Sequence, residues 1–298
     1  MNESLFRLRS GILVVLLIFI LSIFIIPIIP GNQLGVVFGS GENTKGGHLT
    51  VAFLDVGQGD AIYIETPDGI QMLIDGGPDS SILREISRQM SFWDRRLDVI
   101  LATHPDKDHI GGLVDVLNRY EVDNIIRTEN DSDTAVASAF IFSSDEERSA
   151  LRIVKAGEVI VLGASTTLTI YSPEGDVSNW ESNTSSIVVK LQYGEIEFML
   201  TGDAPSGIED YLADTYGAAL ESEVLKLGHH GSKTSTSELF LSKVMPKYAV
   251  VSAGKDNRYG HPHTEVMNRV ESQGIEVLST AELGAIVFKS DGKSVWVE

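Results

Sequence analysis

The sequence contains no cysteine. This absence excludes a thiol nucleophile, a cysteine-ligated zinc ion and disulfide bonds. Any metal ion that the chain binds must therefore be held by His, Asp or Glu side chains. The absence agrees with a location outside the cytoplasm but does not establish one, because a large core needs no disulfides in either compartment.

Basic residues are also scarce. Lys and Arg number 23 against 42 Asp and Glu, which gives a formal net charge of −19 at pH 7. A protein that binds duplex nucleic acid usually presents a basic face that displaces counterions from the phosphates. The negative net charge of this chain therefore argues against duplex binding. It leaves a phosphodiester substrate open, because carboxylates that hold divalent cations are neutralised in the site.

One long apolar run stands near the N-terminus. Residues 11–30 carry no charged side chain and have the length of a single transmembrane helix. Because Arg7 and Arg9 precede the run, we expect residues 1–10 in the cytoplasm and the rest of the chain outside the cell membrane. A cleaved signal peptide is the alternative, but the run is long for one and ends without a small-residue cleavage site.

The chain after the apolar run divides into a short linker and one large domain. Residues 31–47 are Gly-rich and predict a flexible linker. Residues 48–298 then form a domain of about 250 residues, which is long enough to bury a large core.

Strand and helix patterns alternate through this domain. Short apolar runs predict strands, and apolar residues at helical spacing predict helices. The predicted strands are 49–54, 61–65, 71–74, 97–103, 124–127, 167–171, 187–191, 196–201, 224–227, 248–252 and 285–289, with helices near 82–90, 113–120 and 266–275. The acidic, Ser-rich stretch 129–148 predicts an exposed loop with a short helix. This interleaving is typical of an α/β domain whose sheets are covered by helices.

Chemically capable side chains follow the ends of four predicted strands. Six of the seven histidines fall in these places. Because strands packed side by side bring their ends to one edge, clusters far apart in the sequence can meet there. The residues concerned are His104, Asp106, Asp108 and His109 after the strand 97–103, Asp203 after 196–201, His229 and His230 after 224–227, and His261 and His263 beyond 248–252.

The segment from His104 to His109 has the spacing of a metal-binding loop. Alternate residues that leave a strand end project in one direction, while the adjacent Asp108 and His109 project in different ones, so one loop can serve two neighbouring cations. The alternative is a polar loop in which Asp108 caps the following helix. A cap explains Asp108 and leaves two His and Asp106 without a reason, so we favour the metal site.

These motifs resemble the metallo-β-lactamase fold and, within it, the ComEC type. The resemblance runs in order from about residue 50 to the end. It implies a four-layer αββα sandwich and a metal-dependent hydrolase. The ComEC competence protein joins such a domain to a multi-helix channel that nothing here resembles, so we expect a free-standing relative with its own anchor. The matching segments are Asp55-Val56-Gly57-Gln58-Gly59-Asp60, Asp75-Gly76-Gly77, His104 to His109 followed by Ile110-Gly111-Gly112, Gly202-Asp203-Ala204 and His229-His230-Gly231-Ser232.

The resemblance implies two divalent ions, Zn²⁺ or Mn²⁺. His104 and Asp106 would bind one ion, Asp108 and His109 the other, and Asp203 would bridge them. One of His229 and His230 would complete the second site, and the sequence leaves open which.

Two departures from the wider fold bear on the metal. Many members have His where this chain has Asp106, and another His where residues 183–186 stand. Oxygen ligands in place of imidazole make Mn²⁺ as plausible as Zn²⁺.

Catalytic roles follow from the same resemblance. Asp108 and Asp203 would orient the attacking water. Whichever of His229 and His230 is free of metal, together with His261, could protonate the leaving oxygen or hold a phosphate. For His261, a loop histidine satisfied by its own backbone is the open alternative.

Substrate-binding and supporting roles are predicted for a further set. Ser232 and Lys233 are close enough to the His-His turn to meet an anionic substrate, although a solvated lysine is the ordinary alternative. Asn183 is a candidate to bind a substrate oxygen, with an Asx-turn residue as the equal alternative. Asp75 is expected to support the ligand loop. Asp55 and Asp60 are expected to brace turns and not to bind metal.

Together these inferences predict a membrane-anchored phosphodiesterase or nuclease that acts outside the membrane, on single-stranded DNA or another exposed phosphodiester. The acidic charge favours a short or non-nucleic phosphodiester. A β-lactam or lactone hydrolase is the second hypothesis, which Asp106 and the missing third His disfavour. A non-catalytic anchored binding module is the third, against which stands the self-repulsion of a carboxylate cluster without cations. No protein partner is predicted.

Overall fold

The computed structural model describes residues 36–38, 47–147 and 149–298. The transmembrane helix expected over residues 11–30 and most of the expected linker lie outside these ranges. Within them, no helix combines the length and apolar character that crossing a membrane requires.

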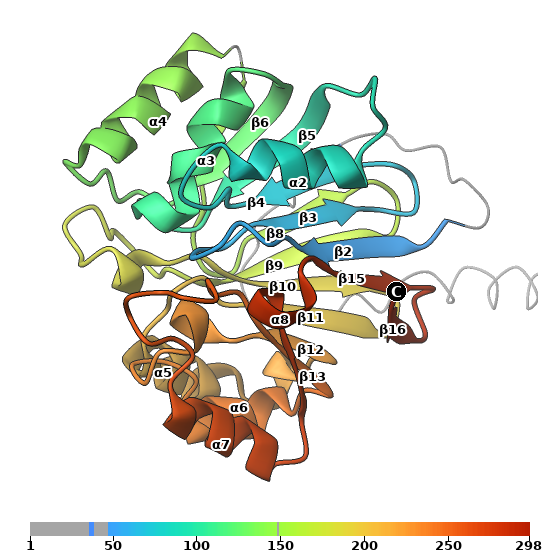
Figure 1. Cartoon of the computed structure of the whole chain (residues 1–298), viewed down its shortest axis with the longest axis vertical. Helices are drawn as coiled ribbons and strands as arrows, with labels where there is room; N and C mark the ends of the chain where they lie inside the picture. Colours follow the sequence, from blue (N-terminus) through green and yellow to red (C-terminus); the bar gives the residue numbers. More distant parts are fainter. Residues whose placement is uncertain (1–35, 39–46, 148) are drawn as a thin grey trace, which may run out of the picture. The chain divides into compact units, whose positions relative to one another are not determined.

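Two eight-stranded sheets form the centre of the described domain (Figure 1). The first sheet has the order β1 (Val36–Phe38), β8 (Val159–Leu162), β9 (Thr166–Ser172), β10 (Val188–Tyr193), β11 (Ile196–Leu200), β12 (Val224–Lys226), β13 (Tyr248–Val251) and β14 (Glu276–Ser279). The second has the order β16 (Val295–Val297), β15 (Ile286–Ser290), β2 (Leu49–Phe53), β3 (Ile62–Glu65), β4 (Gln71–Ile74), β5 (Arg96–Ala102), β6 (Glu121–Arg127) and β7 (Ala150–Ile153).

Helices cover the outer face of each sheet, which completes the predicted αββα sandwich (Figure 1). The second sheet is covered by α2 (Ser81–Gln89), α3 (Lys107–Leu117) and α4 (Ala135–Glu146), and the first by α5 (Ser206–Tyr216), α6 (Glu238–Val244) and α7 (Thr264–Ser272). Short elements complete the chain: α8 (Thr280–Leu283) and the 3₁₀ turns η1 (Asn183–Ser185), η2 (Gly217–Leu220) and η3 (Gly228–Gly231).

The core has three layers because each sheet is apolar on both faces. Between the sheets, the buried rings of Phe53 and Phe198 each lie 5.9 Å from the ring of Phe288. A second apolar layer lies under α2, α3 and α4, and a third lies under α5, α6 and α7. Burial on two faces explains why the strands read as nearly continuous apolar runs in the sequence.

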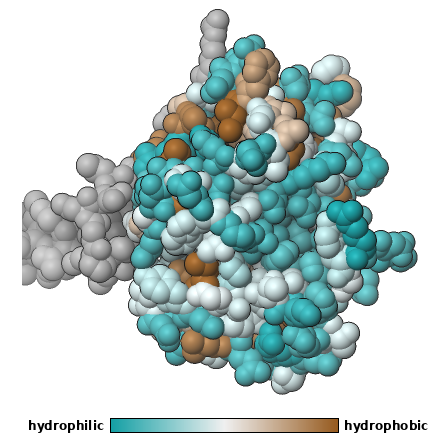
Figure 2. All heavy atoms as spheres, turned by 90° about the vertical axis from the view of Figure 1, so that its left-hand side faces the viewer, coloured by the Kyte–Doolittle hydropathy of each residue, from teal (hydrophilic) through white to brown (hydrophobic). Residues whose placement is uncertain are grey.

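Parallel strands place the loops that carry the chemistry. In one sheet β4, β5 and β6 are parallel, and in the other β11, β12 and β13 are parallel. The carboxyl ends of parallel strands meet at one edge of a sheet, which is where open α/β sheets bind ligands. That edge is on the left of Figure 1, and Figure 2 faces it and shows a mainly hydrophilic surface.

Two segments differ from the sequence expectation. Residues Val36–Phe38 belong to the expected linker but form β1, which pairs in parallel with β8. A strand of three residues is too short to show a period in the sequence. The stretch expected to be an exposed loop with a short helix does contain a helix, but this helix, α4, has 12 residues, and its N-cap Thr134 accepts a hydrogen bond from the backbone N–H of Ala137.

Candidate metal centre

The first ligand segment leaves β5 and enters α3. His104 lies just past the end of β5 and is fully buried. Asp106 occupies the N-cap position of α3, but its side chain makes no capping hydrogen bond, and Asp108 lies in the first turn. The carboxylates of both residues are therefore not used to cap the helix, contrary to the alternative considered for Asp108.

Asp75 holds this segment from behind. It follows β4 and has a left-handed backbone, with φ of 56°. Its carboxylate accepts hydrogen bonds from the backbone N–H of Thr103 at 2.8 Å and from the Thr103 hydroxyl at 2.7 Å, and it lies 2.7 Å from Nδ1 of His109. This contact turns Nε2 of His109 away from Asp75, as the carboxylate partner of a metal-binding imidazole does.

Asp203 is the centre of the cluster. It follows β11 and is buried, and its backbone N–H donates to Oγ of Ser186 at 3.3 Å. Four imidazoles surround its Oδ2. The Oδ2 atom lies 3.3 Å from Nε2 of His109, 3.4 Å from Nε2 of His230, 3.7 Å from Nε2 of His229 and 3.9 Å from Nε2 of His104.

The His-His turn separates its two imidazoles. Both His229 and His230 have left-handed backbones, with φ of 48° and 56°, which is costly for residues other than glycine and is common at functional sites. His230 is buried, and its Nε2 also lies 3.4 Å from Oδ2 of Asp108. The His229 side chain is 26% exposed, and its Nδ1 lies 3.1 Å from the Thr234 hydroxyl. The structure thus directs His230 into the cluster and His229 to its rim.

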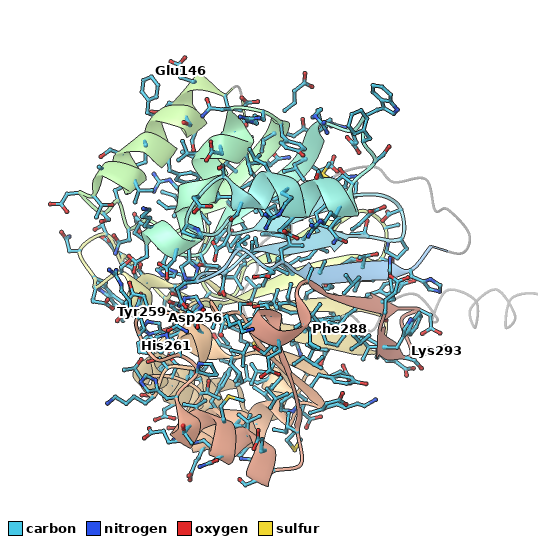
Figure 3. The ribbon with its side chains drawn as sticks, in the orientation of Figure 1. Glu146, Asp256, Tyr259, His261, Phe288 and Lys293 are labelled. Atoms are coloured by element: carbon cyan, nitrogen blue, oxygen red, sulfur yellow. The ribbon has the colours of Figure 1, made fainter. Side chains whose placement is uncertain are left out.

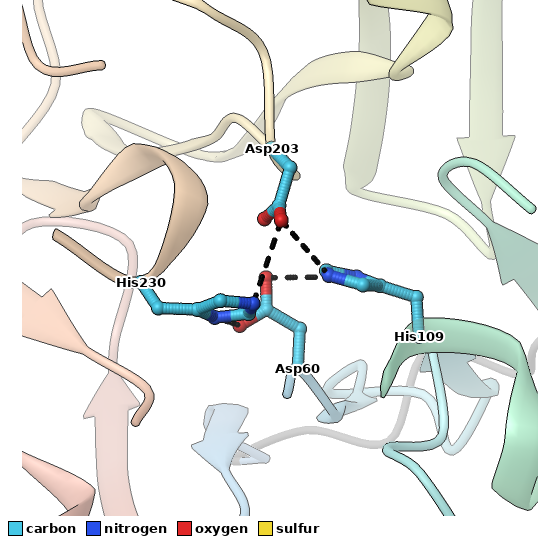
Figure 4. A group of neighbouring side chains, drawn as sticks. All are labelled: Asp60, His109, Asp203 and His230. Atoms are coloured by element: carbon cyan, nitrogen blue, oxygen red, sulfur yellow. Dashed lines mark ion pairs between the residues drawn. The ribbon is translucent and has the colours of Figure 1, made fainter. Parts of the chain in front are cut away.

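Asp60 also belongs to this neighbourhood, which the sequence reasoning missed. Asp60, His109, Asp203 and His230 each offer a ligand atom, and these atoms all lie within 4.8 Å of one another (Figure 4). The carboxylate of Asp60 lies 3.3 Å from Nδ1 of His230 and forms a buried ion pair with Lys226 of β12. The available signal was Lys226 itself, a charged residue inside the apolar strand Val224–Lys226. Asp55, by contrast, braces a turn as expected, with Oδ1 accepting from the Gly57 N–H at 3.2 Å.

The cluster fits divalent cations. Several of its buried atoms lack a hydrogen-bond partner: Nε2 of His104, His109 and His230, and Oδ1 of Asp203. Buried polar atoms are rarely left unpaired in folded proteins, so this concentration points to a missing partner. Ligands placed about 2.1 Å from a tetrahedral ion lie about 3.4 Å apart. The separations from Nε2 of His230 to Asp108 and Asp203, both 3.4 Å, match that spacing.

The pKa values in the cluster show its negative character. Burial lowers the pKa of His109, but the carboxylates of Asp203 and Asp75 raise it well above its usual value. Burial also lowers the pKa of His230, but the carboxylates of Asp203 and Asp60 outweigh it and raise this pKa to about 9. His104 differs, because burial and the neighbouring His109 lower its pKa to about 4. The carboxylates that stabilise a protonated imidazole here would equally stabilise a bound cation.

The remaining predicted residues lie around the rim. His261 lies near His229, with ring centroids 5.4 Å apart, and burial followed by the charge of His229 lowers its pKa to about 4. Figure 3 shows His261 at the edge where the loops of both sheets meet. The Ser232 hydroxyl is buried and bonded to the Thr234 hydroxyl at 3.0 Å, while Lys233 is exposed. Asn183 lies in η1, which approaches Asp203 through Ser186. The substrate-binding roles of Asn183, Ser232 and Lys233 stay predictions.

Comparison with known proteins agrees with this geometry. The family model described as Metallo-beta-lactamase superfamily matches residues 54–255. The chain is 31% identical over 256 residues to ComE operon protein 3 of Bacillus subtilis (strain 168), a match that covers 80% of this chain and 33% of that protein. It is 44% identical over 110 residues to competence protein ComA of Neisseria gonorrhoeae, covering 37% of this chain and 16% of that protein. The chain thus spans a third or less of these relatives.

A solved structure shares the fold. The metallo-beta-lactamase fold protein YhfI from Bacillus subtilis superposes with a TM-score of 0.53 at 11% identity and covers 84% of this chain and all of its own. At that identity the likeness concerns the fold alone.

Proposed function

The chain belongs to the metallo-beta-lactamase superfamily, and from this membership we propose that it is a dinuclear-metal-dependent phosphodiesterase that cleaves single-stranded DNA or a similarly accessible phosphodiester. One observation carries the proposal: unpartnered buried His and Asp atoms from both sheets converge around Asp203. Such a concentration of carboxylates and imidazoles is the chemistry of a divalent-metal site.

We assign the ligands to two neighbouring ions. His104 and Asp106 would hold one ion, and Asp108, His109 and His230 the other. Asp203 would contact both, because its Oδ2 lies within 4 Å of imidazoles on each side. His230 is chosen over His229 because it is buried and contacts Asp108.

Asp60 is assigned to position His230 and not to bind metal. Its carboxylate faces Nδ1 of His230, on the opposite side of the ring from the Nε2 that meets Asp108 and Asp203. Its other oxygen is paired with the ammonium of Lys226, which would repel an adjacent cation. A carboxylate that fixes a ligating histidine from behind is a usual feature of metal sites.

Phosphodiester hydrolysis requires a water to attack phosphorus, the bond from phosphorus to the leaving oxygen to break, and that oxygen to gain a proton. When bound, divalent cations supply the charge that promotes ionisation of water and stabilises the phosphate oxygens. Asp108 and Asp203 would orient the attacking water and accept its proton. His229, partly exposed beside Asp203 and 5.4 Å from the ring of His261, would with His261 hold the phosphate. Because burial lowers the pKa of both imidazoles, either would donate a proton to the leaving oxygen only when the negative charge of the bound phosphate raises its pKa.

The choice of phosphodiester over β-lactam rests on two features. Asp106 stands where many members of the fold have His, and Ser186, in the segment where a further His is usual, contacts Asp203. The names of the relatives, which include a competence protein, support a nucleic-acid substrate.

The test is an assay of the full chain, purified in detergent, with Mn²⁺ or Zn²⁺ against single-stranded DNA, bis-p-nitrophenyl phosphate and nitrocefin. We expect cleavage of the two phosphodiesters, with loss of at least about a hundredfold in Asp203→Asn because the residue contacts both proposed ions. Asp145→Asn, which removes an exposed carboxylate on α4, is the matched control and should keep full activity. Cleavage of nitrocefin alone would overturn the proposal.

We also propose that residues 11–30 anchor the chain in the cell membrane, with residues 1–10 in the cytoplasm and the catalytic domain outside. The charge-free run after Arg7 and Arg9 supports this orientation. Because the chain has no cysteine, Ser4→Cys and Ser242→Cys each create a single thiol. A membrane-impermeant maleimide should label intact cells only through position 242, which is exposed on α6. Labelling only at position 4 would show that the chain has the opposite orientation in the membrane.

A further inference from the structure

A cleft opens beside the proposed metal centre. Its volume is about 470 Å³, which is within the range of small-ligand sites. Asp108, a proposed ligand, forms part of its wall, so a molecule in the cleft reaches the reacting centre. The rest of the wall includes Gln58, Lys107, Arg258 and Tyr259, none of which has a role in the chemistry described above.

One asparagine fixes the loop that carries Arg258 and Tyr259. The Asn257 amide donates to the carbonyls of Gly254 at 2.8 Å and His261 at 2.6 Å. Its Oδ1 accepts from the N–H groups of Tyr259 at 3.2 Å and His261 at 3.0 Å. Gln58, from the loop between β2 and β3, accepts from the Gly254 N–H at 3.2 Å and so ties the loop to the other sheet. The loop is therefore shaped before any ligand arrives.

This loop presents an aromatic platform. The Tyr259 ring stacks on His261 with centroids 5.7 Å apart and an interplanar angle of 20°, and it extends the row of rings that starts at His229. Tyr259 is nevertheless 49% exposed. The Arg258 guanidinium lies 4.9 Å from the ring centre, and its Nη2 donates to the Tyr259 hydroxyl at 2.7 Å. Tyr259 and His261 lie together at the open edge in Figure 3.

The surroundings favour an anionic, base-bearing ligand. Lys107 and Arg258 are both exposed in the wall of the cleft, against the carboxylates of Asp108, which is proposed to hold metal, and Asp256. Nε2 of Gln58 is a buried donor without a hydrogen-bond partner. The face is mainly hydrophilic, as Figure 2 shows, which disfavours a purely apolar occupant. Cations interleaved with exposed aromatic rings are the usual means of holding single-stranded nucleic acid.

We propose that Tyr259 stacks a nucleobase next to the scissile phosphodiester, while Lys107 and Arg258 hold the adjoining phosphates. This inference rests on the proposed phosphodiesterase function and adds to it a preference for substrates that carry bases. Stacking on a ring tolerates any base, so the preference is for single-stranded nucleic acid without a fixed sequence.

The test compares two oligomers of equal length and charge, an oligothymidylate and its fully abasic analogue, cleaved by the full chain with Mn²⁺. The wild type should prefer the oligothymidylate in kcat/KM by roughly tenfold, from the usual range of base stacking. Tyr259→Ala should abolish this preference mainly through a higher KM, and Tyr259→Phe should restore it because the ring and not the hydroxyl is required. Lys107→Gln should lower kcat/KM equally for both oligomers and leave the ratio of the two kcat/KM values unchanged. Trp93→Ala, at an aromatic residue that is 86% exposed and outside the cleft wall, is the control.

The outcomes separate the two proposals. If the wild type cleaves both oligomers equally, or if Tyr259→Ala keeps the preference, the platform is wrong and the phosphodiesterase function stands. If the wild type cleaves neither oligomer but hydrolyses bis-p-nitrophenyl phosphate, the platform is wrong and the phosphodiesterase function stands. If it cleaves none of the three substrates, both proposals are wrong. A preference lost in Tyr259→Phe as well as in Tyr259→Ala would also contradict stacking.

Discussion

Lys226 and Asp60 form an ion pair that is buried directly behind His230. Both side chains are almost completely shielded from water, and the Asp60 carboxylate also lies 3.3 Å from Nδ1 of His230. Two charges cost several kcal/mol each to bury, so such a pair is tolerated where it holds a particular arrangement. Here the arrangement is the orientation of one proposed metal ligand.

Breaking this pair from one side should be more harmful than removing it. Asp60→Asn leaves the Lys226 ammonium buried without a counter-charge, and we expect it to lower the free energy of unfolding by about 3–5 kcal/mol. The double variant Asp60→Asn/Lys226→Met should recover most of that loss. Urea unfolding of the three proteins measures the difference. A double variant as unstable as Asp60→Asn would show that the pair itself is not the cause.

Glu209 is a buried carboxylate outside the metal cluster. It lies on α5 and accepts the backbone N–H groups of Thr236 and Ser237, both at 2.8 Å, just after the His-His turn. Burial raises its pKa from 4.5 to about 7, although those N–H groups oppose the shift. Because the pKa of Glu209 is higher in the folded state than in the unfolded state, Glu209 favours folding fully below pH 4.5. This contribution to the free energy of unfolding is lost as the pH rises through 7.

The ionisation of Glu209 should therefore lower the free energy of unfolding between about pH 4.5 and pH 8. A shift of this size corresponds to about 3 kcal/mol. Glu209→Gln removes the ionisation, so unfolding free energies measured across this range should fall more steeply in the wild type than in the variant. Parallel pH profiles would contradict the shift.

At the scale of elements, the site depends on how closely α3 approaches the end of β4. A Cβ atom at Gly112 would lie 2.0 Å from the carbonyl oxygen of Gly76 and 2.6 Å from that of Asp79. Only glycine fits this contact, which sets α3 and its proposed ligands Asp108 and His109 against Asp75. A Cβ at Gly207 of α5, by contrast, would meet nothing within 4 Å.

The same Gly-to-Ala change should therefore have opposite effects at these two helical positions. Gly112→Ala should destabilise the fold by roughly 1–3 kcal/mol, because backbone atoms must move. Gly207→Ala should stabilise it by roughly 0.5–1 kcal/mol, because alanine is the better helix former. Thermal unfolding of both variants gives the comparison, and similar effects at both positions would contradict the packing argument.

The elements that the sequence predicts well are those with a continuous pattern. The strands β4, β5 and β12 and the helix α2 lie within a few residues of their predicted bounds, since strands buried on both faces leave long apolar runs. The strand β1 was missed because its three residues are too few to show a period in the sequence.

The cluster of candidate ligands could be predicted because strand ends meet at one edge. Two of its details could not. The choice between His229 and His230 depends on two consecutive left-handed residues that no local pattern reveals. The position of Asp60 depends on Lys226, a partner from the other sheet.

At the scale of the whole domain, the site joins two halves. His104, Asp108 and His109 come from the second sheet and its helix, and Asp203 and His230 follow strands of the first. A ligand that binds only when both halves are in place stabilises the folded state by mass action. The proposed site also gathers several of the acidic groups that contribute to the net charge of −19. Bound cations would neutralise these carboxylates, so the net charge opposes the binding of a phosphodiester less than its value suggests.

The central claim is that this junction holds a pair of divalent cations. Equilibrium dialysis of the full chain against Mn²⁺, followed by elemental analysis, tests it most directly. We predict two ions per chain in the wild type and a loss of both in Asp203→Asn, because Asp203 contacts both proposed sites. A single ion per chain would instead favour one site formed by Asp60, His109, Asp203 and His230, and no bound ion would contradict the metal centre altogether.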